Sequence, residues 1–137
     1  MHYSKKLAIA LCLSWTAASQ ALAGTPAAPE PIVTPIMQQD LPDVPGKEAL
    51  MLLVQYPPGA ADPVHRHDAE ALVYVLEGKI VMGVQGGQEQ TLGPGQTFHE
   101  GMHDIHTVGR NASKTQPAKF LAILIKDKGK PALIPVH

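Results

Sequence analysis

Apolar residues occur in short runs along the last two-thirds of the chain, and each run stops at a turn rich in glycine or proline. The runs cover residues 49–56, 71–76, 80–84, 90–92, 96–100, 104–108 and 119–126. The turns between them include Pro57-Pro58-Gly59, Gly86-Gly87 and Gly93-Pro94-Gly95. Short runs at regular spacing are typical of an all-β sandwich or barrel. No segment keeps a 3.6-residue period, so little helix is expected.

The first 23 residues have the pattern of a secretory signal peptide. Lys5 and Lys6 precede the apolar run 7–13, and Ala21-Leu22-Ala23 is a small-x-small cleavage site. We expect cleavage after Ala23 and a secreted or periplasmic product. The apolar run is short for a bilayer span, so no stable membrane association is expected after cleavage.

Cleavage would also change the chemistry that is available to the chain. The single cysteine, Cys12, leaves with the signal peptide, so the mature protein would have no disulfide and no thiolate chemistry. Loss of two lysines leaves 9 of the 11 basic residues against 12 acidic ones, a formal net charge of −3. No basic patch stands out, which argues against nucleic acid as a partner.

Three further parts follow the signal peptide. Residues 24–45 are rich in proline and alanine, which favours extended backbone, and this segment is expected to be a tether or an arm on a neighbouring subunit. Residues 46–127 hold the apolar runs and form the predicted barrel. Residues 128–137 are an apolar tail, expected to cover a sheet edge or to pair with a partner subunit.

The sequence His65-Arg66-His67 is the strongest indication of chemistry. Residues two apart on a strand share a face, so the two imidazoles would project side by side and hold one metal ion from a rigid strand. A third histidine, His106, follows in a later segment rich in glycine and histidine. These residues predict a metal site.

The spacing around these histidines resembles that of the cupin family. Gly59, five residues, His65-x-His67 and then the turn at Gly78 is similar to the first cupin motif. Gly95, five residues, Gly101 and then His106 is similar to the second. The resemblance covers about residues 46–126. It implies a single domain with a double-stranded β-helix, a jelly-roll barrel with a metal site in its mouth. It also implies His65, His67 and His106 as ligands of one divalent transition metal.

The glutamate of the first cupin motif is where the chain departs from the family. Counted back from the turn glycine, its position is Ala71, and the nearest acid, Glu70, lies one residue early. On a regular strand Glu70 would face away from the histidines, whereas a bulge at Asp68-Ala69 would turn it inward. Two interpretations follow: Glu70 is a fourth ligand, or the site has three histidines and open positions for water or substrate.

The second motif is altered as well, with Gly101 where the family usually has proline and His103 where it usually has glycine. His103 is expected in a turn, either as a solvated histidine or as a proton shuttle or substrate contact. Glu100 is a candidate acid–base or outer-shell carboxylate, and its alternative is a structural salt bridge. His99 and Glu100 face opposite ways on a strand, so only one of them looks into the barrel.

The sequence leaves the metal open among Fe, Mn, Ni, Cu and Zn, all of which imidazole suits. The resemblance implies a metal-dependent, dioxygenase-like enzyme acting on an enolic or phenolic small molecule. The alternatives are a binding module that captures a metal ion or a small-molecule ligand without turnover, and a structural barrel with no metal. The resemblance also implies a homodimer formed through sheet edges and exchanged arms.

Overall fold

The structure is a computed structural model that describes residues 26–137, so the predicted signal peptide lies outside the described residues. Every regular element in the described part is a β-strand. The strands are β1 Ile32–Asp40, β2 Lys47–Tyr56, β3 His65–Arg66, β4 Ala69–Glu77, β5 Ile80–Val84, β6 Gln90–Leu92, β7 Thr97–Glu100, β8 His106–Asn111, β9 Ala118–Asp127 and β10 Ile134–Pro135. No helix in residues 26–137 is long and apolar enough to cross a membrane.

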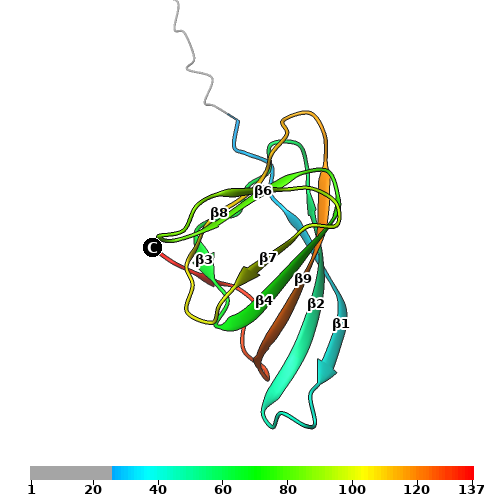
Figure 1. Ribbon diagram of the computed structural model, residues 1–137, viewed down its shortest axis with the longest axis vertical. Coiled ribbons are helices and arrows are strands. Elements are labelled where there is room, and N and C mark those ends of the chain that lie inside the picture. Colours follow the sequence, from blue (N-terminus) through cyan, green and yellow to red (C-terminus); the bar gives the residue numbers. More distant parts are fainter. Residues whose placement is uncertain (1–25) are drawn as a thin grey trace, which may run out of the picture.

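The ten strands form two five-stranded antiparallel sheets. One has the order β1-β2-β9-β4-β7 and the other the order β10-β3-β8-β5-β6. The sheets face each other and curve into a barrel (Figure 1). The predicted all-β jelly-roll fold is confirmed.

Side chains alternate between the barrel interior and its outer surface, as the pleat of a strand requires. In β4 the inward residues are Ala69, Ala71, Val73 and Val75, and in β9 they are Ala118, Phe120, Ala122 and Leu124. Half of these inward residues are alanines, and the small side chains leave room inside the barrel. The outward residues of β4 are also apolar: Leu72, Tyr74 and Leu76 are each more than 40% exposed.

The proline-rich segment is more ordered than a tether. Its residues Ile32–Asp40 form β1, which pairs antiparallel with β2 along its whole length. The register shifts between Pro35 and Met37, so Pro35 lies beside a bulge on an edge strand. These are the places where a sheet accepts proline, because the missing N–H is not needed by a further strand. Pro35 therefore marks an edge of the sheet.

A buried ion pair links β2 to β9. The Lys126 ammonium donates to Glu48 and to the Lys130 carbonyl oxygen at 2.6 Å, and Gln38 donates to the same carboxylate at 2.7 Å. The hydrogen bond from Lys126, followed by that from Gln38, lowers the pKa of Glu48 to about 2. The stability that this pair contributes is complete above the carboxyl's ordinary value of 4.5 and is lost as the pH falls toward 2.

Replacement of Lys126 by methionine is expected to lower the melting temperature by about 10 °C, because it leaves Glu48 buried without its cation. The matched control is the double variant Glu48→Met/Lys126→Met, which removes both charges and should recover most of the loss. Thermal unfolding followed by circular dichroism at pH 7 measures both. Equal melting temperatures for the single variant and the native chain would show that the pair contributes nothing.

Candidate metal centre

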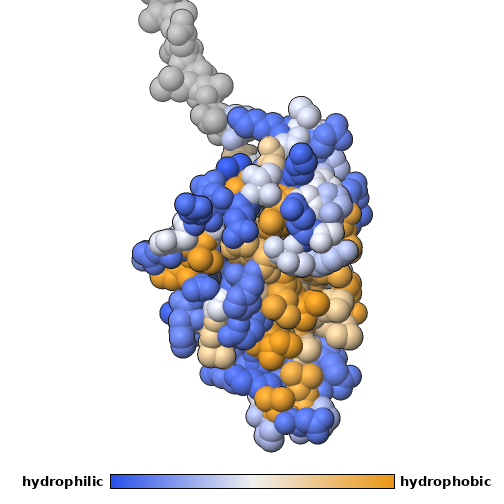
Figure 2. All heavy atoms as spheres, viewed as in Figure 1, coloured by the Kyte–Doolittle hydropathy of each residue, from blue (hydrophilic) through white to orange (hydrophobic). Residues whose placement is uncertain are grey.

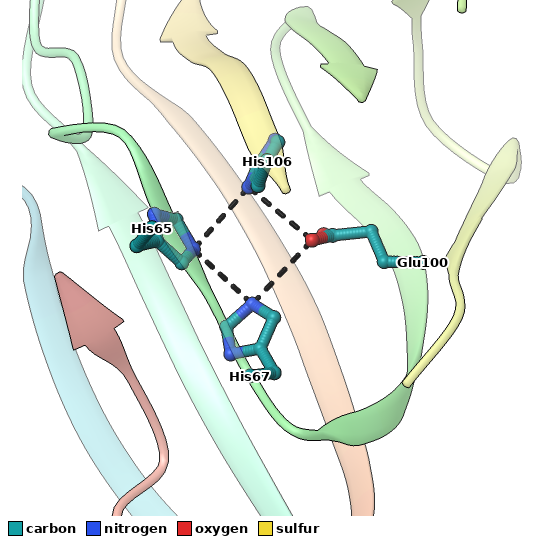
Figure 3. Close-up of side chains that lie close together, drawn as sticks. All are labelled: His65, His67, Glu100 and His106. Atoms are coloured by element: carbon teal, nitrogen blue, oxygen red, sulfur yellow. Dashed lines mark hydrogen bonds and ion pairs between the residues drawn. The ribbon is translucent and has the colours of Figure 1, made fainter. Parts of the chain in front are cut away.

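Four polar side chains converge inside the barrel from both sheets. His65 begins β3 and is paired directly with His106, the first residue of β8. His67 follows two residues after His65, and Glu100 comes from the last position of β7 in the opposite sheet. Figure 3 shows the four side chains pointing toward one another. Of these, His65, Glu100 and His106 are buried, and His67 is nearly so.

The donor atoms of the four residues lie within 4.8 Å of one another. His65 Nε2 is 3.2 Å from His67 Nε2 and 3.3 Å from His106 Nδ1. Glu100 Oε2 is 3.6 Å from His67 Nε2 and 3.5 Å from His106 Nδ1. Ligands that each lie about 2 Å from one common ion have separations of this size.

The positions of the histidine protons show why this cluster suits a cation. His65 donates from Nδ1 to the Pro63 carbonyl oxygen at 2.8 Å, and His67 donates from Nδ1 to that of Ala132 at 2.6 Å. With the proton on Nδ1, the Nε2 atom of a neutral imidazole carries only a lone pair, which is the form that a metal ion binds. Glu100 Oε2 is buried and has no hydrogen-bond partner. The chemistry of the donor set therefore fits a divalent transition metal.

The surroundings shift the protonation of the cluster in two directions. Burial, together with the nearby His65 and His67, lowers the pKa of His106 to about 4, and burial also lowers the pKa of His67. These imidazoles are neutral at pH 7, which is the form that binds metals. Burial and the negative charges of Asp62 and Asp104 raise the pKa of Glu100 to about 7. Protons therefore compete with a metal ion for Glu100 near neutral pH.

The cluster forms the polar end of a cavity of about 250 Å³. The remaining wall is mainly apolar and includes Leu52, Val54, Val73, Met82, Phe120 and Ala122. Among residues 26–137, no lysine or arginine lines this cavity. The cavity can therefore bind a small molecule with an apolar body and one polar end that reaches the four donor groups.

A family model described as the cupin domain matches residues 52–124. The chain belongs to the cupin family. Among curated protein sequences, no relative matches this cupin.

Solved structures share the cupin fold at low sequence identity. An uncharacterised conserved protein with a double-stranded β-helix domain from Klebsiella pneumoniae has a TM-score of 0.62 and 17% identity, over 82% of this chain and 90% of that one. The polyketide cyclase RemF from Streptomyces resistomycificus has a TM-score of 0.59 and 21% identity, over 85% and 78%. The DMSP lyase DddQ from Ruegeria pomeroyi has a TM-score of 0.56 and 23% identity, over 64% of this chain and 43% of that one. This cupin thus spans less than half of that lyase, and the likeness establishes the fold.

The first cupin motif implies a carboxylate on the strand that is β4 here. In this cupin the carboxylate of the cluster, Glu100, comes from β7 instead. Ala71, at the position where the family has glutamate, faces the cavity and is paired directly with Glu100 across β4 and β7. Residues that are opposite each other in an antiparallel pair share a face with Cβ atoms about 5 Å apart. The small Ala71 side chain leaves space, and Glu100 fills it. Sequence analysis expected Glu100 to act as an acid–base or outer-shell group, whereas the structure places it among the donors.

Glu70 is not brought into the cluster. The bulge that would have turned it inward does not form, although Asp68 has a left-handed backbone with φ of 46°. Glu70 instead faces outward, where its carboxylate is 2.6 Å from His99 Nε2 and both side chains are about half exposed. His103 is exposed in the turn between β7 and β8, as expected for a solvated histidine.

The structure also reveals a carboxylate in the cavity that sequence analysis did not single out. Asp62 lines the cavity and accepts a hydrogen bond from the hydroxyl of the fully buried Tyr56. Its backbone N–H donates to the Gly109 carbonyl oxygen at 2.8 Å, which fixes the loop before β3 against β8. Burial raises the pKa of Asp62 and that of Tyr56 above their ordinary values. The only indication in the sequence was its position three residues before His65.

Proposed function

We propose that this cupin is an exported, metal-dependent enzyme of the dioxygenase-like kind that acts on an enolic or phenolic small molecule. The observation that carries the proposal is the buried cluster of His65, His67, Glu100 and His106 at the end of an apolar cavity. Held by these four residues, a divalent transition metal supplies Lewis acidity and, as Fe or Cu, redox chemistry with O₂.

The charges around the cavity favour a neutral substrate or one with a single acidic hydroxyl. Two carboxylates, Asp62 and Glu100, line the cavity, and among residues 26–137 no lysine or arginine does, so the bound metal ion would be the one positive charge that meets a substrate anion. A dicarboxylate could place one group at that ion, but its second group would meet an apolar wall of low dielectric constant without a counter-charge. An enol or a phenol places one oxygen at the cluster and its apolar body against Val73 and Phe120.

Asp62 is the group in this site that is placed to accept a proton. One of its oxygens, Oδ2, is held by the Tyr56 hydroxyl, which orients the carboxylate within the cavity. When Glu100 holds the metal, Asp62 is the remaining carboxylate in the cavity wall. The proton that leaves the hydroxyl of an enol or phenol would pass to Asp62, while the apolar wall excludes water from the reaction.

The alternative is a module that captures a metal ion or a small-molecule ligand without turnover. The observation in its favour is that the protein itself supplies four donors, as in closed structural metal sites, where no position is left open for chemistry. Tight ligand binding with no product formed under O₂ would support this alternative over the enzyme.

The first test is the metal content of the mature protein purified from its export compartment. About one Fe, Mn, Ni, Cu or Zn per chain is expected, and its loss is expected in the variant His65→Ala/His67→Ala, since two of the four donors are removed. Elemental analysis measures both, and His103→Ala is a matched control because His103 is exposed and lies outside the cluster. The absence of metal from the native protein would contradict the proposal.

We also propose that two copies associate through the outer face of the sheet β1-β2-β9-β4-β7. Exposed apolar side chains gather there on β4 and β1: Leu72, Tyr74, Leu76, Ile32, Ile36 and Met37. Figure 2 shows hydrophobic residues over strands β4, β9 and β2. An apolar surface of this kind commonly marks an interface, and β1 is also a free edge of the sheet.

Light scattering at micromolar concentration is expected to give the mass of two mature chains. Replacement of Leu72 by glutamate is expected to reduce the measured mass to that of one chain, because it places a charge in the apolar face. The circular dichroism spectrum of this variant should stay that of the native chain. A native mass of one chain would overturn the proposed dimer.

A further inference from the structure

The C-terminal segment crosses from one sheet of the barrel to the other. It leaves β9 in the sheet β1-β2-β9-β4-β7, where the Lys128 N–H donates to the Gly46 carbonyl oxygen at 2.9 Å. It then reaches the other sheet, where β10 pairs with β3 and Pro135 lies opposite His65. Val136 N–H extends this pairing with a hydrogen bond of 3.2 Å to the Val64 carbonyl oxygen. Figure 1 shows the segment running beside β3.

This segment contacts the cluster of His65, His67, Glu100 and His106 directly. The Ala132 carbonyl oxygen accepts the hydrogen bond from His67 Nδ1 at 2.6 Å, across 65 positions of sequence. Ala132 also packs against the hydrophobic core, and both Ala132 and Leu133 line the cavity. The tail therefore supplies a hydrogen-bond acceptor to one ligand and part of the cavity wall.

The two histidines of the first motif are held in different ways. His65 donates to the Pro63 carbonyl oxygen two residues away, within the same loop. The Nδ1 atom of His67, in contrast, is hydrogen-bonded to the docked tail. A neutral imidazole carries its proton on either nitrogen, and an acceptor at Nδ1 keeps Nε2 free for a metal. The Nδ1 hydrogen bond of His67 thus depends on the tail, whereas the Nδ1 hydrogen bond of His65 does not.

We propose that the segment 131–136 is a working part of the metal centre, in which the Ala132 carbonyl positions His67 and the Leu133 side chain limits the size of the ligand that enters. The inference rests on the proposed metal centre. Leu133 suits the second role, because its side chain is 39% exposed and yet lines the cavity.

The first test compares Co²⁺ binding by the full chain with binding by a variant that lacks residues 131–137. Isothermal titration is expected to give an affinity weaker by about 10- to 100-fold in the deletion variant, the usual effect of losing an outer-shell partner of a ligand. The matched control is a variant that lacks only the exposed His137, which keeps the Ala132 carbonyl and should bind Co²⁺ like the full chain. Equal affinity in a folded deletion variant would overturn the positioning role.

A second measurement applies even if the deletion variant does not fold. In the metal-free full chain, ¹⁵N spectra of the histidines are expected to show the His67 proton on Nδ1 at neutral pH. A His67 proton on Nε2 would overturn the inference. No Co²⁺ binding by the full chain would instead contradict the proposed metal centre itself, so the two failures are distinguishable.

The role of Leu133 is tested with catechol and 4-tert-butylcatechol as probes on the Co²⁺-loaded protein. Leu133→Ala is expected to shift the ratio of the two affinities toward the bulky probe on the order of 10-fold, since a few methylene groups in a pocket discriminate by about that factor. An unchanged ratio would overturn the size-limiting role.

Discussion

Replacement of Glu100 by glutamine is expected to weaken metal binding on the order of 100-fold or more, while it makes the metal-free protein more stable at pH 8. The first effect follows because Glu100 Oε2 is the one anionic donor of the cluster and has no other partner. Loss of such a ligand should exceed the roughly 10- to 100-fold effect of losing an outer-shell group. Titration with Zn²⁺ or Co²⁺ measures it.

The second effect follows from the pKa of Glu100, which is raised from 4.5 to about 7. Between these values the folded, metal-free protein keeps a proton that the unfolded chain has lost. Its stability therefore falls as the pH rises through this window, by about 3 kcal/mol in total. Glutamine is neutral at every pH, so the variant avoids that loss.

Urea unfolding in the presence of a chelator is the measurement for the second effect. The variant and the native chain should have similar free energies of unfolding at pH 4, and the variant should be more stable at pH 8. The matched control is Glu70→Gln, which changes a half-exposed carboxylate outside the cluster and should leave metal affinity unchanged. A Glu100→Gln variant that binds metal like the native chain would remove Glu100 from the proposed donor set.

Replacement of Gly78 by alanine is expected to destabilise the fold by about 3 kcal/mol or more, enough to prevent folding of a marginally stable domain. Gly78 has a left-handed backbone with φ of 70° in the turn between β4 and β5. A Cβ atom there would lie 2.4 Å from the Pro117 carbonyl oxygen and 2.8 Å from Ala118 Cα. Both are backbone atoms, so neither can turn aside as a side chain would.

Gly86→Ala is the matched control for this prediction. Gly86 has a similar φ of 78°, but a Cβ atom there meets nothing within 4 Å. Gly86→Ala should therefore lower the free energy of unfolding only by the backbone strain, about 1 kcal/mol. Chemical denaturation of both variants separates the close approach from the strain. Equal losses in the two variants would show that the contact with Pro117 and Ala118 relaxes freely.

The departures from the sequence-based expectations come from contacts that local pattern cannot show. Glu70 and Glu100 were both candidates, and which of them enters the barrel depends on the pairing that places Glu100 opposite Ala71. That register pairs two residues, Ala71 and Glu100, that are 29 positions apart in the sequence. The proline-rich segment was expected to be a tether or an arm on a neighbouring subunit, because proline resists regular structure. Its residues Ile32–Asp40 form an edge strand, and the bulge in that strand accepts Pro35.

The sequence by itself determined the all-β class, the turns and the pair His65 and His67, because alternation along a strand and the spacing of His65-x-His67 depend only on neighbouring residues. The resemblance to the second cupin motif added His106. The tertiary structure alone decided the fourth donor, the Asp62–Tyr56 pair in the cavity and the Ala132 carbonyl that holds His67. Each of these depends on how distant strands and the tail dock. A backbone carbonyl in particular is present at every residue, so no choice of amino acid marks the one that will meet a ligand.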